Sequence, residues 1–356
     1  MTISEIPLIK FENLTKDFGQ IRAVDNLNLE VYEGEIIGLV GPNGAGKTTA
    51  IKMLANILTP SQGRILLKDK NNKLQDVVTN PNILNKSGFL IDIPSFYEGI
   101  TAYELLKYFA KLQNYPKNMV ESRIDEVLQL IDLFEWKHQK VKIFSKGMKQ
   151  KLGLAQALIH DPQIVVLDEP QIGLDPKARV DIRNILKDLQ KNGKTIFLAS
   201  HMLYEISEVC DKIALINRGI LLEFDKISEL EKKLPMHEIK CLLLDPIESE
   251  YVGSILSMLE DKLKSYLVEA STYTNQQHHI LYDPSVKGLK ILYDGKEDTQ
   301  NKILTTLIKE TNLKITSFFT PKTYQLESIY MALIKRDEVK RRKDLEYKNQ
   351  NKKGQL

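Results

Sequence analysis

The chain has 356 residues, of which 42% are hydrophobic and 27% charged, and its formal net charge is +3. A chain of this length and ordinary composition predicts about two soluble globular domains. The small net charge excludes a strongly basic or acidic protein and decides nothing about nucleic acid. With Cys210 and Cys241 as the two cysteines, a disulfide framework is not expected, and a reducing compartment fits.

The sequence shows no pattern typical of a secretion signal or of a membrane span. The first residues include Glu5 and lack a basic segment followed by an apolar core, so we expect no signal peptide. No stretch approaches the roughly 18 uncharged apolar residues of a membrane span. If the protein works at a membrane, another polypeptide is expected to cross it.

The first two thirds of the chain alternate between strands and helices. Residues 8–33 predict two antiparallel strands, ended by Gly34. The further predicted elements are a buried strand 36–40, a helix from about 47 to 58, mostly helical structure over 101–160, strand 164–167, helix 176–191, strand 195–200, helix 203–210 and a short strand pair around 217–219. Strands alternating with helices predict an α/β core, and strands apolar on both faces predict a parallel sheet covered on both sides.

The pattern changes after Pro235. The predicted elements there are strand 238–244, helix 251–267, strand 278–283, strand 288–294, helix 298–310 and strand 313–319. This β-α-β-β-α-β order is that of ferredoxin-like domains. A helix is expected from about Thr323, and the tail from Lys335 carries nine Lys/Arg against four Asp/Glu. We therefore expect domains at 1–234 and 235–320, followed by a C-terminal helix and basic tail at 321–356.

A phosphate-binding loop follows the first buried strand. Its sequence fits the pattern G-x-x-x-x-G-K-[ST], and the residues expected to contact nucleotide are Gly41, Pro42, Asn43, Gly44, Ala45, Gly46, Lys47, Thr48 and Thr49. The glycines let backbone N–H groups turn toward phosphate oxygens, and the helix that follows directs its positive end at the same anion. Lys47 adds a unit charge worth about 4 kcal/mol against one phosphate charge at ~4 Å. Thr48 offers a hydroxyl to Mg²⁺.

Two adjacent acids end the next buried strand, 164–167. Ligands of open α/β sheets bind at this edge of the sheet. Asp168 is predicted to hold Mg²⁺ through water, and Glu169 to accept a proton from the attacking water. A solvated strand end is the alternative reading of an isolated Asp-Glu pair, and the phosphate loop in the same chain disfavours it.

The segment Phe144 to Met148 resembles a helix start prepared for an anion. Ser145 is a plausible N-cap, and an apolar stripe follows it along the predicted helix. Residues 8 to about 232 resemble the nucleotide-binding subunit of an ATP-binding cassette (ABC) transporter. "FSKGM" at 144–148 is similar to the family signature, and it lies 23 residues before Asp168.

The resemblance implies roles for further residues. Phe18 matches the aromatic that stacks on adenine, Asp175 lies in the D-loop "GLDP", and His201 matches the switch histidine that reaches the γ-phosphate. The implied fold is a P-loop NTPase cassette with a mixed RecA-like sheet, an antiparallel β subdomain and a helical subdomain at about 93–160. The α+β, possibly ferredoxin-like extension recurs in the exporter branch of the family.

In the family, two cassettes associate head to tail, and each signature completes the nucleotide site of the other chain. The resemblance therefore implies a homodimer or heterodimer in which Ser145 and the N–H of Gly147 bind the γ-phosphate in trans. ATP and Mg²⁺ are the implied cofactors. A separate transmembrane permease, resembling those of drug, peptide and bacitracin resistance systems, would place the subunit peripherally on the cytoplasmic face of the membrane.

Two positions depart from the family pattern. Lys146 and Met148 replace a glycine and a glutamine of the signature, so Lys146 must fit a backbone that a glycine usually supplies. No glutamine occurs between Gln75 and Gln113, and the alignment places Asp92 at the Q-loop position. A carboxylate there can still bind Mg²⁺ or its water, but it adds negative charge beside the γ-phosphate. We expect slower hydrolysis or a stronger dependence on Mg²⁺.

The alternative function is a cassette ATPase that acts on nucleic acid or another soluble partner. DNA-acting cassettes usually carry a long coiled-coil insertion, whereas Lys47 and Ser145 are only 98 residues apart. Translation-factor cassettes are double, and only one phosphate loop is present. The basic tail is the remaining argument for nucleic acid, with a solvated helix or contact with anionic lipid as the other readings. Nucleic acid is not expected to be the partner.

Overall fold

The protein is described here from a computed structural model, which covers residues 6–232, 237–264, 266–267 and 279–320, with 326, 329–331, 333–335 and 337. The chain divides into two compact units, residues 1–226 and 227–356. The division lies earlier than the boundary expected at 234, because the central sheet ends with its last strand at Lys226. The helix expected from about Thr323 and the basic tail lie largely outside the described residues.

The first unit contains two sheets. The antiparallel one has the order β2-β1-β4-β5 and is formed by β1 (Ile9–Phe18), β2 (Ile21–Val31), β4 (Gln62–Lys68) and β5 (Leu74–Asp76). The central one has the order β10-β9-β3-β8-β7-β6 and is formed by β3 (Ile36–Val40), β6 (Ser87–Leu90), β7 (Ile164–Asp168), β8 (Thr195–Ser200), β9 (Lys212–Asn217) and β10 (Ile220–Lys226). Five of its strands are parallel, and β10 pairs antiparallel with β9.

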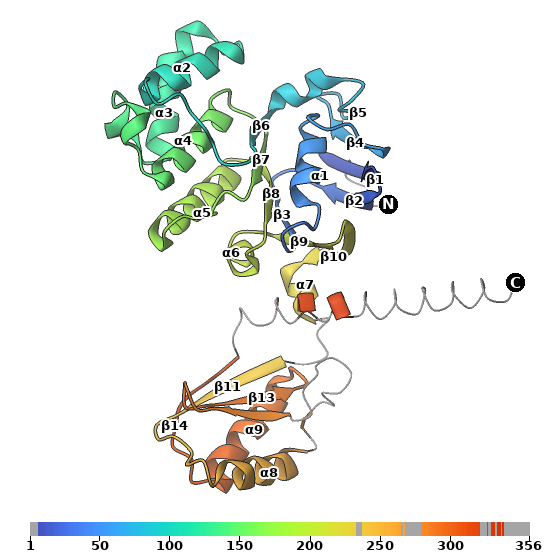
Figure 1. The fold of residues 1–356 in the computed structure, drawn as a ribbon, viewed down its shortest axis with the longest axis vertical. Helices are drawn as coiled ribbons and strands as arrows, with labels where there is room; N and C mark the ends of the chain where they lie inside the picture. Colours follow the sequence, from blue (N-terminus) through green and yellow to red (C-terminus); the bar gives the residue numbers. More distant parts are fainter. Residues whose placement is uncertain are drawn as a thin grey trace, which may run out of the picture. The chain divides into compact units, whose positions relative to one another are not determined.

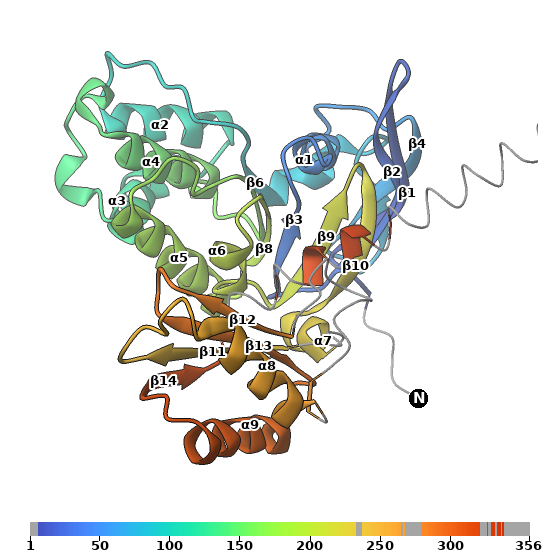
Figure 2. The same ribbon diagram turned by 60° about the horizontal axis from the view of Figure 1, so that its bottom comes forward.

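Helices cover both faces of the central sheet, as the apolar strands predict (Figures 1 and 2). On one face, Ile37 and Leu39 of β3 share a core with Ile51 of α1 (Lys47–Leu54) and with the antiparallel sheet. On the other face, Gly38 faces Ile206 and Cys210, so close that a Cβ at Gly38 would lie 2.5 Å from Ile206. That face carries α6 (Leu203–Ser207) and α5 (Pro176–Lys191).

A helical region branches from the central sheet after β6. It contains α2 (Ala102–Leu112), α3 (Val120–Leu130) and α4 (Lys146–Leu158), which pack on one another (Figure 1). The Thr101 hydroxyl and the Glu104 carboxylate cap the start of α2 reciprocally, which fixes where the helix begins. At the start of α4, Ser145 Oγ accepts from the Met148 N–H at 3.2 Å, so the predicted N-cap is confirmed.

The second unit begins with α7 (Ile227–Lys232) and continues as β11 (His237–Leu243), α8 (Val252–Leu263), β12 (Ile280–Asp283), β13 (Gly288–Tyr293), α9 (Glu297–Glu310) and β14 (Ile315–Phe319). All pairings in its sheet are antiparallel, in the order β12-β13-β11-β14. This is the β-α-β-β-α-β succession expected after Pro235. Apolar residues of α8 and α9 form one core with the same face of the sheet.

Three strands of the first unit are absent from the sequence prediction, namely β4, β5 and β6. β4 has three consecutive buried residues among exposed ones, β5 spans three residues, and β6 spans four. β4 is long enough but its apolar residues are consecutive and do not alternate, and β5 and β6 are too short to show a clear period of two. Their pairing depends on neighbours distant in the sequence. The helix expected over 47–58 ends at Leu54, where Asn56 adopts a positive φ of 55°.

Within the described part of the chain, no helix is both long and apolar enough to span a bilayer.

Candidate functional site

Four neighbouring parallel strands end at one edge of the central sheet, and each is followed by a predicted site segment. β3 leads to the phosphate loop, β8 to His201, β7 to Asp168 and Glu169, and β6 to Asp92. Their register is continuous: Val40 pairs with Ser200, Ala199 with Asp168, and Leu167 with Leu90. Residues spread over more than 150 positions of sequence are therefore gathered at one edge, where α/β sheets bind ligands.

The phosphate loop requires glycine at two crowded positions. A Cβ at Gly41 would lie 2.2 Å from the carbonyl oxygen of Ile216. Gly46 adopts a φ of 103°, and a Cβ there would lie 2.3 Å from the carbonyl oxygen of Ala23. Any side chain would push the loop away from β2 and β9, which explains the glycines independently of any ligand.

Lys47 is the first residue of α1, and its side chain is only 5% exposed. Its ammonium donates to the carbonyl oxygens of Gly41 at 2.8 Å and Pro42 at 3.1 Å. Glu169 Oε1 lies 3.5 Å from the same nitrogen. The buried charge is thus satisfied by the loop itself and by Glu169, the residue after β7, so Lys47 connects these two parts of the site.

Glu169 also contacts the histidine that follows β8. Its Oε2 lies 2.9 Å from Nδ1 of His201 and accepts from the His201 backbone N–H at 3.4 Å. Glu169 has a positive φ of 48°, an uncommon conformation for a non-glycine residue. The structure therefore brings Lys47, Glu169 and His201 together at the end of the central sheet.

Asp168 is buried at 3% exposure, and its Oδ1 has no hydrogen-bond partner. Burial raises the pKa of Asp168, the hydrogen bond from the Thr48 side chain lowers it, and the negative charges of Glu169 and Asp92 raise it. A buried carboxylate beside a hydroxyl and two further acids is a donor set that favours a hard cation. In the described parts of the chain no group of three or more His, Cys, Asp and Glu could hold a metal by itself.

Asp92 follows β6 in a left-handed conformation, with a φ of 62°. Its carboxylate lies 2.8 Å from the Lys52 ammonium of α1. Asp92 follows β6, which pairs with β7 of Asp168, and the negative charge of Asp92 raises the pKa of Asp168. The sequence alignment at this position is thus compatible with the geometry, and the Lys52 partner was not foreseen.

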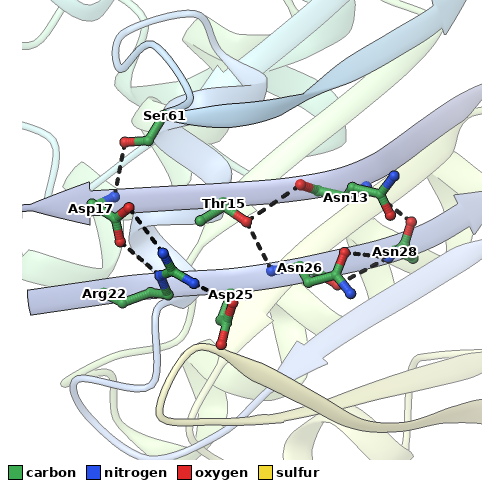
Figure 3. A network of polar contacts seen from close by, with 8 residues as sticks. All are labelled: Asn13, Thr15, Asp17, Arg22, Asp25, Asn26, Asn28 and Ser61. Atoms are coloured by element: carbon green, nitrogen blue, oxygen red, sulfur yellow. Dashed lines mark hydrogen bonds and ion pairs between the residues drawn. The ribbon is translucent and has the colours of Figure 1, made fainter.

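Phe18 ends β1 and is 46% exposed. The Lys16 ammonium lies 5.2 Å from its ring centre and donates to the Thr59 carbonyl oxygen at 2.7 Å. The Asp17 N–H donates to Ser61 Oγ at 3.0 Å, as Figure 3 shows. The tip of the hairpin is therefore tied to the segment that follows α1.

The hairpin of β1 and β2 is irregular, and side chains compensate for the lost ladder bonds (Figure 3). Thr15 Oγ1 accepts from the Asn26 N–H at 3.0 Å, and Asn28 Oδ1 accepts from the Asn13 N–H at 2.9 Å. Nearer the tip, Arg22 bonds both Asp17 and Asp25. These bonds hold the strand that presents Phe18 despite the register shifts.

The signature residues pack against the D-loop of the same chain. Ala178 Cβ lies 3.4 Å from the place where a Cβ of Gly147 would be, and the Lys146 ammonium lies over Gly173. Asp175 caps α5, accepting from the Ala178 N–H at 2.9 Å. Lys146 belongs to α4, so its backbone is helical and requires no glycine. Lys146 therefore occupies the glycine position of the family signature without backbone strain.

Comparisons with known proteins agree with this geometry. The ABC transporter family matches residues 24–171, which include the phosphate loop, the signature and both acids. The bacitracin transport ATP-binding protein BcrA of Enterococcus faecalis is 40% identical over 315 residues, covering 88% of this chain and 95% of that protein. The chain belongs to the family of ABC transporter ATP-binding proteins. It is the ATP-hydrolysing subunit of a transporter.

The relatives extend beyond the cassette. Because the first unit ends at Lys226, a match over 315 residues continues into the second unit. The ABC transporter ATP-binding protein YxlF of Bacillus subtilis is 30% identical and covers 92% of this chain and 99% of its own length. The structure of cbiO1 from Clostridium perfringens, part of the ABC transporter complex cbiONQ, matches at a TM-score of 0.56 with 27% identity, over 65% of this chain and 97% of that chain.

Phe18 is expected to stack on the adenine of ATP. Phe18→Ala is expected to weaken binding of ATP about tenfold, because stacking on an aromatic ring is worth roughly 1–3 kcal/mol per base. Inorganic tripolyphosphate has no base, so its binding should be unchanged. Ile21→Ala is the matched control, since Ile21 pairs with Phe18 across the hairpin and is 70% exposed. Calorimetry measures both ligands, and equal weakening of both would contradict the stacking role.

Proposed function

We propose that two cassettes bind two Mg²⁺–ATP between them, hydrolyse them, and drive export through a separate transmembrane permease. The observation that carries the proposal is the convergence of the phosphate loop, Asp168, Glu169, His201 and Asp92 on one sheet edge. ATP is the ligand that the family binds, and Mg²⁺, when bound, would neutralise phosphate charge during transfer.

In this proposal the residues of one chain have separate tasks. Lys47 leaves the carbonyl oxygens of the loop for the phosphate oxygens, and the loop N–H groups and the start of α1 hold the same anion. Glu169 takes a proton from water as the water oxygen bonds to the γ-phosphorus and the bond to the ADP oxygen breaks. His201 positions Glu169 through the 2.9 Å contact. Thr48 and Asp168 are the residues that would hold the metal.

The second half of the site comes from the partner subunit. Ser145 and Gly147 open a helix of 13 residues with no acidic residue in its first turn, so its positive end remains available to an anion. Within their own chain they contact α4 and the start of α5. Each chain therefore offers an anion-binding helix end to the triphosphate of the other.

A mixing experiment tests this division. Gly147→Asp places a carboxylate where phosphate would bind, and it suits a first helical turn, so the variant should fold. Alone, Gly147→Asp and Lys47→Ala chains should both be nearly inactive. Mixed, they should recover part of the ATPase activity, because one site of each mixed dimer joins an intact loop to an intact signature. Gly147→Asn has a side chain of similar size without the charge, so it shows whether the charge or the size of Asp causes the loss of activity. If no mixture recovered ATPase activity, sharing of the site between two chains would be contradicted.

The permease is tested by its physical association. A tagged chain purified from detergent-solubilised membranes should carry a protein with several membrane spans, identified by mass spectrometry. BcrA is named for bacitracin transport, so we propose a peptide antibiotic as the exported substrate. Cells that carry Lys47→Ala should then become more sensitive to bacitracin than cells that carry the wild type. Recovery of the tagged chain only as a soluble monomer would argue strongly against transport.

A further inference from the structure

Asp92 is an acid beside the reaction centre with a cationic neighbour of its own. β6 pairs with β7 through Leu90 and Leu167, so Asp92 and Asp168 follow adjacent strand ends. Electrostatic coupling between the two carboxylates agrees with this placement. The Asp92 side chain is 62% exposed, so water and ions can reach it, whereas Asp168 is buried.

Lys52 lies five positions after Lys47 on α1, and both lysines are paired with acids of the same sheet edge. Lys47 lies 3.5 Å from Glu169, and Lys52 lies 2.8 Å from Asp92. Lys47 is buried by the loop, while Lys52 is 30% exposed in the last turn of the helix. One helix therefore supplies a cation to each of two acids at the site.

We propose that Lys52 is a positioning residue that holds Asp92 and competes with Mg²⁺ for its carboxylate, so that it sets the Mg²⁺ concentration needed for ATP binding. The inference rests on the proposed function, because it takes the edge near Asp168 as the Mg²⁺–ATP site. Lys52 is expected to reduce the negative charge that Asp92 presents to the triphosphate. Release of Asp92 from Lys52 makes its oxygens available to the metal or to water bound there.

The Lys52–Asp92 ion pair is weak enough for Mg²⁺ to replace Lys52 at the carboxylate. Exposed lysine–carboxylate pairs change an equilibrium constant by a factor of about 1.5 to 5, far less than a buried pair. The positive φ of Asp92 limits the substitutions that keep its position, because Asp and Asn tolerate this conformation better than Gln or Ala. Asp92→Asn therefore removes the charge without straining the backbone.

The test measures ATP binding to the full chain by calorimetry during a Mg²⁺ titration. Lys52→Gln should lower the Mg²⁺ concentration at half-maximal binding about twofold to fivefold, and Lys52→Arg should resemble the wild type. Asp92→Asn should raise that concentration. In the Asp92→Asn background, Lys52→Gln should cause no further shift. Lys117→Gln removes an exposed charge from the helical region and is the control.

Three results would overturn the inference. If Lys52→Gln shifted the Mg²⁺ midpoint equally in the wild type and in Asp92→Asn, the lysine would act through its charge on the whole site and not through Asp92. An unchanged midpoint in Asp92→Asn would show that Asp92 does not act on the metal, and an unchanged midpoint in Lys52→Gln would remove the competition. A wild-type chain that binds no ATP at any Mg²⁺ concentration would instead refute the proposed function, which separates the two failures.

Discussion

Replacing Glu169 with Gln is expected to lower ATP turnover at least about a hundredfold while ATP remains bound. General-base assistance contributes about 10²–10⁴-fold, and the amide cannot accept the proton of the attacking water. The shape of the side chain is retained, and before ATP binds Lys47 keeps its bonds to the carbonyl oxygens of Gly41 and Pro42. The loop should therefore stay intact. Phosphate release gives the turnover, and calorimetry gives the affinity.

The same variant should accumulate as a dimer with ATP. If hydrolysis separates the two cassettes, a chain that binds but does not hydrolyse should elute as a dimer in size-exclusion chromatography when Mg²⁺–ATP is present. Glu135→Gln removes an exposed carboxylate from the helical region and should leave turnover unchanged. Near-normal hydrolysis by Glu169→Gln would place the general base elsewhere.

Sequence patterns located the elements with strong local signals. Helix α5 matches its predicted bounds, because Asp175 caps it, Pro176 fills the first position, and Gly193 follows its end at a φ of 79°. The strands Ile36–Val40 and Thr195–Ser200 were evident from apolar runs, which in the second strand cover residues 196–199. In contrast, β4 and β6 have few apolar residues and depend on partners far along the chain.

The site likewise contains residues with local sequence signals and contacts that depend on segments distant in the sequence. Motif spacing named Lys47, Asp168 and Glu169, because phosphate binding constrains these residues locally. No local pattern reveals that Lys52 pairs with Asp92, or that the Lys146 ammonium lies over Gly173. Those contacts join segments brought together only by the parallel order of the central sheet. Lys52 lies five residues after Lys47, but this spacing alone does not predict its partner. The pair becomes evident only when the position of Asp92 in the fold is known.

Replacing Lys47 with Ala is expected to weaken ATP binding at least about tenfold. A hydrogen-bonded charge contributes about 1.5–3 kcal/mol, so the dissociation constant should rise roughly tenfold to more than a hundredfold. The loss of affinity should be nearly as large for tripolyphosphate as for ATP, since Lys47 acts on phosphate. This is the opposite of the behaviour expected of Phe18→Ala.

The fold should tolerate the change in Lys47. The ammonium is buried, so its removal relieves the cost of burying a charge. It also leaves the carbonyl oxygens of Gly41 and Pro42 without that donor, and the two effects oppose each other. Circular dichroism should therefore show a melting temperature close to that of the wild type. Lys191→Ala, at a side chain 75% exposed near the end of α5, controls for the loss of a positive charge. If Lys47→Ala bound ATP normally while folded, the loop of residues 41–48 would not be the phosphate site, and the roles assigned to Glu169 and His201 around it would lose their basis.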